Sequence, residues 1–131
     1  MATHDDVRRI ASKLPGATES AEGPFGYYVT HKGKAKGFLW TWMERVDPKK
    51  ARVPNPGVLA IVVRDNDIKQ ILLGGDEKKI FTEPHYNGFP AVLVRLDAID
   101  DETLEDLVVE AWRCKAPAGL VAEFDARNGP S

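Results

Sequence analysis

Three histidines and one cysteine are the side chains of this sequence best suited to metal binding or nucleophilic chemistry. His4, His31 and His85 have neither the i, i+4 nor the CxxC-like spacing of zinc sites. Cys114 is expected on the inner face of a helix near its carboxyl end, where burial and the helix dipole disfavour a thiolate. We therefore predict a core cysteine, solvent-exposed side chains for His4 and His31, and a protein without metal, cofactor or enzymatic activity.

His85 has the best-placed potential partner of the three histidines. Glu83 stands two residues before it, so on a strand both side chains would point to the same side, where a carboxylate can orient an imidazole. No motif marks a serine or cysteine nucleophile nearby. Two interpretations stay open: a histidine hydrogen-bonded within its own turn, or a pocket for a small ligand or peptide walled by Trp40, His85 and Tyr86.

Charged residues are distributed unevenly along the chain. The formal net charge is only -2, yet residues 32–52 carry seven basic and two acidic side chains, and residues 97–110 carry seven acidic side chains and no basic one. The acidic residues suit the first turn and outer face of a helix. The glycine turns lack the GxGxxG and GxxxxGK patterns of phosphate loops. We predict a dipolar molecule, and two interpretations of its basic side stay open: a surface that contacts phosphate groups, or an edge that only keeps the protein soluble while the tryptophan residues lie in the core. The basic residues proposed for this contact are Lys32, Lys34, Lys36, Lys49, Lys50 and Arg52.

The N-terminal half is expected to form a helix and then a hairpin. Apolar residues recur with helical spacing from Val7 to Leu14. Phe25–Thr30 and Ala35–Met43 are aromatic and β-branched runs joined by the short turn His31–Lys34, which predicts a β-hairpin. Glu44–Pro56 contains three prolines and is expected to be an irregular, mobile loop. Alternation along the second strand places three aromatic side chains on one face: Phe38, Trp40 and Trp42.

The C-terminal half is expected to add strands and a long helix. Val58–Val63 is apolar on both faces and predicts a central strand, and a short helix after it should bury Ile68, Ile71 and Leu72. Asn87-Gly88 between two apolar runs predicts a second hairpin with a type I′ turn. A long helix capped by Asp100 or Asp101 follows, and a short helical turn is predicted at 119–124. The residues of the long helix predicted to face inward are Leu104, Leu107, Val108, Ala111 and Cys114.

This order predicts an α+β fold. Strands joined by tight turns cannot be parallel, so we expect an antiparallel sheet of about five strands with the N- and C-terminal helices packed on one face. The 131 residues fit a single domain, 1–131, with an ordered core of about 4–125. A single cysteine and a first segment unlike a signal peptide predict a cytoplasmic protein. The apolar runs are too short to predict a membrane span.

Several segments, taken in order, resemble the MmcQ/YjbR family. The similarity extends over about His4 to Phe124 and implies an α+β fold with helices flanking an antiparallel sheet. It also implies a DNA-binding protein with a double-wing arrangement, and it transfers no catalytic residue. The long Glu44–Pro56 segment departs from many relatives, which are shorter there. The segments that carry the resemblance are Leu14–Glu19, Lys32–Lys34, Phe81–Leu96, Ala111–Arg113, Ala116-Pro117 and Leu120.

Two hypotheses for function follow from these residues. The first is a DNA-binding protein that uses the basic hairpin and the basic loop, with Trp40 and Trp42 near enough in sequence to stack on bases. The second is a domain that binds a small ligand or peptide near Glu83–Pro90.

Overall fold

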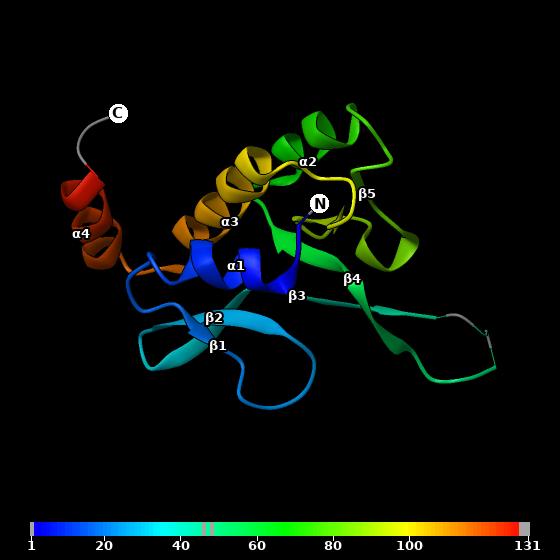
Figure 1. The fold of residues 1–131 in the computed structure, drawn as a ribbon, viewed down its shortest axis with the longest axis horizontal. Coiled ribbons are helices and arrows are strands. Elements are labelled where there is room, and N and C mark those ends of the chain that lie inside the picture. The colour runs from blue at the N-terminus through cyan, green and yellow to red at the C-terminus, as the bar shows by residue number, and fades with distance from the viewer. Residues whose placement is uncertain (1, 46, 48, 129–131) are drawn as a thin grey trace.

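The computed structural model describes residues 2–45, 47 and 49–128, except for the side chains of His85 and Asn128. Within these residues the chain forms one antiparallel sheet of six strands in the order β1-β2-β3-β4-β6-β5 (Figure 1). The strands are β1 (Thr18–Glu19), β2 (Gly26–His31), β3 (Lys34–Glu44), β4 (Val53–Val62), β5 (Ile80–Phe81) and β6 (Ala91–Arg95). The helices are α1 (His4–Ala11), α2 (Asn66–Leu73), the short 3-10 helix η1 (Pro84–Tyr86), α3 (Asp101–Lys115) and α4 (Ala118–Asn128).

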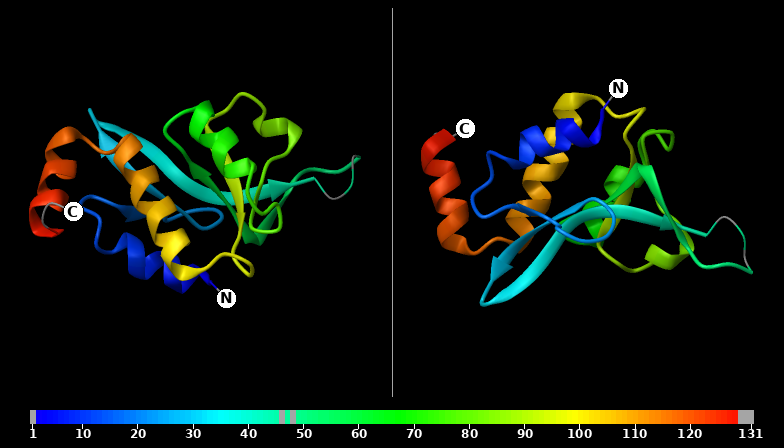
Figure 2. Two further views of the ribbon diagram at one scale, coloured as in Figure 1. Left: turned by 90° about the horizontal axis from the view of Figure 1, so that it is seen from above. Right: turned by 60° about the horizontal axis from the view of Figure 1, so that its bottom comes forward.

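Helices α1 and α3 pack together on one face of the sheet (Figures 1 and 2). The Thr3 hydroxyl accepts the Asp6 N–H at 3.3 Å and the Asp6 carboxylate accepts the Thr3 N–H at 2.9 Å, a capping box that begins α1. The Asp100 carboxylate caps α3 by accepting the Thr103 N–H at 3.0 Å. The predicted α+β fold with both helices on one face is confirmed. The sheet has six strands and not about five because β1, only two residues long, is too short to leave a pattern in the sequence.

The first predicted hairpin is confirmed. Lys32 and Gly33 form its turn with φ of 55° and 78°, the pair of positive values that a type I′ turn requires. A β-bulge at Phe38 then changes the alternation of β3, since Tyr27 pairs with Leu39 and Tyr28 pairs with Gly37. Phe38 packs in the core under the helices, whereas Trp42 packs on the opposite face of the sheet. The prediction that the three aromatic residues share one face is therefore wrong.

The segment predicted as an irregular loop forms most of a second, longer hairpin. Strand β3 continues to Glu44 and β4 begins at Val53, with Met43 opposite Pro54. Pro54 has no N–H to donate, and the Met43 carbonyl accepts a hydrogen bond from Arg52 Nη1 at 2.9 Å. We call residues 42–55 the arm. Figures 1 and 2 show it extending beyond the body of the molecule.

The second predicted hairpin is formed only in part. Strands β5 and β6 pair, but β5 ends at Phe81 and η1 occupies the connection between them. Asn87 has φ -60° and ψ 128°, Gly88 has φ 78°, and the Phe89 N–H donates to the Tyr86 carbonyl at 3.0 Å. These angles define a type II turn and not the predicted type I′ turn, because Asn87 stays at negative φ.

Most of the residues predicted to face inward on α2 and α3 are confirmed, and two are wrong. Leu104, Leu107, Val108 and Ala111 are buried on α3, and Ile68 and Leu72 of α2 pack against the core. Ile71 is 71% exposed, whereas Lys69 is buried at 2% exposure. Cys114 is exposed and Trp112 is fully buried, so the predicted core cysteine is wrong. Burial of Lys69 and Trp112 is possible because the Lys69 ammonium and the Trp112 indole N–H donate to backbone carbonyl oxygens inside the protein. Helix α4 is also longer than the short turn predicted at 119–124.

Gly16 provides a test of the contact between the α1–β1 connection and α4. Its φ is 74°, and a Cβ there would lie 2.9 Å from Leu120 Cδ1. We expect Gly16→Ala to lower the free energy of unfolding by more than the about 1–2 kcal/mol that a left-handed φ alone costs, measured by urea denaturation. Gly23→Ala is the control, since Gly23 has a similar φ of 77° and open space around it. Equal losses in the two variants would show that the contact with Leu120 adds nothing.

Candidate functional site

The six basic residues predicted to bind phosphate lie at opposite ends of β3. Lys32, Lys34 and Lys36 are at the β2–β3 turn, and Lys49, Lys50 and Arg52 are at the tip of the arm. The part of β3 from Lys36 to Glu44 separates the two groups by about 26 Å. All the views in Figures 1 and 2 show the turn and the arm at opposite ends of the molecule. The structure therefore does not gather these residues into one basic surface.

The β2–β3 turn holds the more concentrated of the two basic groups. His31, Lys32, Lys34 and Lys36 line a hollow of about 320 Å³. We call these four residues the basic hairpin. His31 is opposite Lys34 across the strands, and Lys36 follows Lys34 by two residues on the same face of β3. The three lysine residues are exposed, and no carboxylate in the described part of the chain forms an ion pair with them.

His31 fixes the position of the basic hairpin against α3. Its Nδ1 lies 3.2 Å from the carbonyl oxygen of Lys115 in the last turn of that helix, which brings a fourth lysine residue to this end of the molecule. His31 is half-buried, so its predicted solvent exposure is wrong. His4 is also half-buried, stacked on Phe25 at 4.2 Å with Nε2 2.8 Å from the Pro56 carbonyl. Both histidines thus join segments that are distant in the sequence.

The basic residues of the arm are partly engaged within the arm itself. The Arg52 guanidinium donates to the Met43 carbonyl and lies 3.7 Å from Glu83 Oε1. Arg45 Nη1 donates to the Lys50 carbonyl at 3.1 Å. Lys49 and Lys50 are exposed. Arg52 is therefore a structural residue of the arm as well as a positive charge.

Acidic side chains are concentrated at the far end of α3 from the basic hairpin. Asp101, Glu102, Glu105 and Asp106 line a hollow there, with Arg9 of α1 as the single basic lining residue. The fifteen residues of α3 span about 22 Å, and His31 contacts the last of them. The predicted separation of charge is thus present along α3.

The side chains proposed as walls of a ligand pocket pack against one another. Trp40 Nε1 donates to the Tyr86 hydroxyl at 3.2 Å, and the Phe89 ring lies 6.2 Å from each of these two rings. Tyr86 is buried in a cluster on the sheet face opposite α1 and α3, with Trp42, Val58 and Leu93 among its members. The backbone of His85 lies in η1, and its side chain is outside the described part of the structure.

Three buried polar atoms close to this cluster have no hydrogen-bond partner among the described residues. They are Trp42 Nε1, Thr82 Oγ1 and Glu83 Oε1. Glu83 Oε1 lies 3.7 Å from Arg52 Nη1, which is an ion pair beyond hydrogen-bonding distance. Buried polar atoms normally have a hydrogen-bond partner. A small polar molecule that binds these three atoms therefore stays a hypothesis for the ligand site predicted near Glu83–Pro90.

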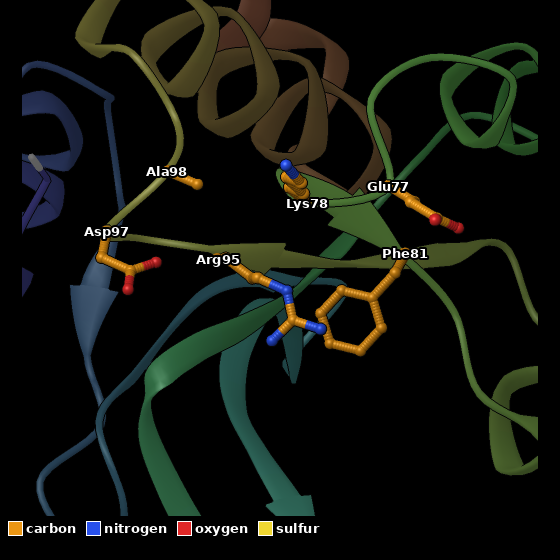
Figure 3. A pocket seen from close by; sticks show the side chains of 6 residues that line it. All are labelled: Glu77, Lys78, Phe81, Arg95, Asp97 and Ala98. Carbon is orange, nitrogen blue, oxygen red and sulfur yellow. The ribbon is translucent and has the colours of Figure 1, made fainter.

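A further hollow, of about 560 Å³, lies at the β5–β6 edge of the sheet (Figure 3). The Arg95 guanidinium stacks on the Phe81 ring with its Cζ 4.1 Å from the ring centroid, and Lys78 is the other basic lining residue. Glu77 and Asp97 line the same hollow. Two acidic and two basic side chains leave it without net charge, so it has less attraction for an anion than the basic hairpin.

Metal binding and thiol chemistry find no support in the described residues. No group of three or more His, Cys, Asp or Glu side chains there could hold a metal ion. Desolvation raises the pKa of the Cys114 thiol even though the residue is exposed, so a thiolate is disfavoured. No described helix is long and apolar enough to cross a membrane.

Comparison with known proteins identifies relatives in sequence and in structure. No family model matches the chain. The crystal structure of Deinococcus radiodurans protein DR2400, which has a DUF419 domain, covers 100% of this chain and 84% of its own, with a TM-score of 0.60 and 20% sequence identity. That similarity extends to the fold. The uncharacterised proteins Rv2570 of Mycobacterium tuberculosis and Mb2600 of Mycobacterium bovis are each 37% identical over 135 residues, which cover 98% of this chain and 100% of theirs. The chain therefore belongs to the same protein family as these two mycobacterial proteins.

Proposed function

We propose that this protein is a non-enzymatic DNA-binding protein that holds the phosphate backbone with its basic hairpin. The observation that supports this function is a hollow lined by three lysine residues and His31, with no carboxylate among its lining residues. Exposed lysine side chains on a β-hairpin can reach phosphate oxygens without entering a groove, and such contacts carry affinity without sequence specificity. The resemblance to the MmcQ/YjbR family and its double-wing arrangement supports the same proposal. A reducing cytoplasmic location suits both DNA binding and a chain with one cysteine.

The arm provides the second wing in this proposal. The length of β3, about 33 Å, is close to one turn of duplex DNA, about 34 Å. The basic hairpin and the arm can then contact phosphates one turn apart on one duplex. Lys49 and Lys50 are the exposed residues for the arm contact, while Arg52 stabilises the arm through its hydrogen bond to the Met43 carbonyl.

Salt dependence and charge reversal test this function. Binding to a labelled 20-base-pair duplex is measured by fluorescence anisotropy at several salt concentrations. Contacts from Lys32, Lys34 and Lys36 alone predict a slope of log affinity against log salt of about -2.7. We expect Lys34→Glu combined with Lys36→Glu to weaken binding at least about tenfold, because two attractive contacts become repulsive.

The matched control is Lys49→Glu combined with Lys50→Glu, an equal change of charge at the other end of β3. We expect it to weaken binding to the 20-base-pair duplex and to leave an 8-base-pair duplex unaffected, while the hairpin variant weakens both. No binding at low salt, or equal weakening by both variants on the short duplex, contradicts the proposed hairpin contact.

A further inference from the structure

An apolar groove lies between α2 and α3 on the face of the sheet that carries the helices. Figures 1 and 2 show these two helices on the same side of the sheet. Its volume is about 460 Å³, within the range of about 300–1,000 Å³ that is typical of ligand sites. Apolar side chains from both helices and from the end of β4 line it, with a few charged residues at its edges. The lining residues are Val62, Val63, Arg64, Ile68, Leu72, Thr103, Asp106, Leu107 and Glu110.

The groove follows one face of α3 for several turns. Thr103, Asp106, Leu107 and Glu110 have the spacing i, i+3, i+4, i+7, which places them on a single stripe of the helix. The exposed Cys114 continues this stripe one turn further. From Thr103 to Cys114 the stripe is about 16 Å long, or three helical turns.

The wall formed by α2 ends in an exposed apolar side chain. Ile68 and Leu72 line the groove, and Ile71, three residues after Ile68, lies beside it on the helix surface at 71% exposure. Single exposed apolar residues are ordinary, but this one extends an apolar groove that is already open. The combined surface can accept apolar anchors spaced along a second helix.

The charge at the edges of the groove is mainly acidic. Asp106 and Glu110 stand on the α3 side, and Asp101, Glu102 and Glu105 continue the acidic surface of that helix. Arg64 is the basic residue in the lining, and its guanidinium lies 3.1 Å from the Asp65 carboxylate, which offsets its charge. Arg113 lies 3.8 Å from Glu110 in the same way, so Asp106 is the acid of the lining that contributes most negative charge. An occupant with positive charge flanking its apolar side chains complements this surface.

We propose that the α2–α3 groove binds a basic amphipathic helix of a partner protein. Apolar residues of that helix enter between Ile68, Leu72 and Leu107, and its lysine or arginine residues face Asp106 and Glu110. The three-turn length of the stripe matches a helix of about 11 residues. This surface lies along α2 and α3, apart from the basic hairpin, so the inference does not depend on DNA binding.

The test uses a labelled 14-residue peptide with leucine residues at i, i+3, i+4 and i+7 and lysine residues on its flanks. A second peptide has the same composition in an order that destroys the apolar stripe. We expect the first peptide to bind the full-length protein at least about tenfold more tightly than the second, a difference of about 1.4 kcal/mol. Binding should also slow the reaction of Cys114, the single cysteine, with a thiol reagent.

Two exposed residues supply the variants, so that folding is preserved. Ile71→Ser and Asp106→Lys should each weaken the amphipathic peptide several-fold, measured by anisotropy. Glu77→Lys, an equal change of charge outside the groove, is the control and should leave the affinity within about twofold. Equal binding of both peptides, or affinities unchanged by the two groove variants, overturns the proposal. Self-association that is abolished by Ile71→Ser overturns it too, by assigning the groove to a second copy of the chain.

Discussion

Replacing Trp112 by alanine is expected to lower the free energy of unfolding by about 3–5 kcal/mol. The Trp112 side chain is fully buried in the core between the helices and the sheet. Its Nε1 donates to the Pro15 carbonyl at 3.0 Å, and its ring meets the Phe124 ring edge-on at 5.3 Å. The Trp112 side chain thus connects α3 with the α1–β1 connection, through Pro15, and with α4, through Phe124. Removing it leaves a cavity and an unpaired carbonyl, and both destabilise the fold.

Urea denaturation followed by far-ultraviolet circular dichroism measures this loss. Trp112→Phe separates the two causes, because phenylalanine keeps most of the apolar volume and removes the N–H donor. We expect it to cost about 1–3 kcal/mol, the range for a buried acceptor left without its partner. A loss under about 1 kcal/mol for Trp112→Ala would mean that α4 and the Pro15 segment do not pack on α3 as described.

Replacing the buried Lys69 by methionine is expected to lower the free energy of unfolding by about 2–3 kcal/mol at neutral pH. Lys69 Nζ donates to the Tyr86 carbonyl at 2.5 Å and to the Phe89 carbonyl at 2.8 Å, the two ends of the type II turn. Methionine matches the length of the side chain but removes both charged hydrogen bonds, so each carbonyl keeps only its backbone donor, Phe89 N–H for Tyr86 and Ala91 N–H for Phe89. The Phe89 ring, which packs on Trp40 and Tyr86, should lose its fixed position as a consequence.

The stabilisation by Lys69 should grow as the pH rises. Burial lowers the pKa of Lys69 in the folded protein, so between this pKa and the unfolded value of about 10.4 the unfolded state binds more protons. Raising the pH through that window therefore favours the folded state. Neutral lysine still has two N–H donors, enough for both carbonyls.

Denaturation of the wild type and of Lys69→Met at pH 7 and at about pH 10.4, the pKa of unfolded lysine, measures this effect. The difference in free energy of unfolding between the two proteins should be larger at the higher pH. Lys78→Met makes the same change at an exposed lysine residue and should show no such trend. A difference that stays constant or shrinks would show that Lys69 has no lowered pKa in the folded state.

The basic hairpin illustrates what local sequence can predict about a binding site. The lysine-glycine turn and the flanking strands are set by residues within a few positions of one another, so the hairpin and its exposed lysine residues are predictable. Whether distant basic residues join it depends on the length of β3. The sequence predicted that strand to end at Met43, and the structure separates Lys49, Lys50 and Arg52 from the hairpin by most of β3.

The groove between α2 and α3 illustrates the opposite case. Periodicity predicted both helices, but the predicted inward residues included Ile71 and Cys114, which are exposed. Helical spacing defines an apolar stripe only within about one residue to either side, and the partner atoms select the rotation. Lys69 faces inward because its ammonium donates to the Tyr86 and Phe89 carbonyl oxygens. Trp112 faces inward because the Pro15 carbonyl oxygen accepts its indole N–H.

Sequence alone determined the α+β class, the helix caps, the first hairpin and the separation of charge, because each depends on interactions between neighbouring residues. Tertiary structure decided that Ile71 and Cys114 are exposed while Lys69 and Trp112 are buried, where the bulge at Phe38 divides the aromatic residues, and which lysine residues share one hollow. These features depend on strand register and on carbonyl groups contributed by segments distant in the chain. Such partners leave no periodic pattern in the sequence, so only the folded chain brings them together.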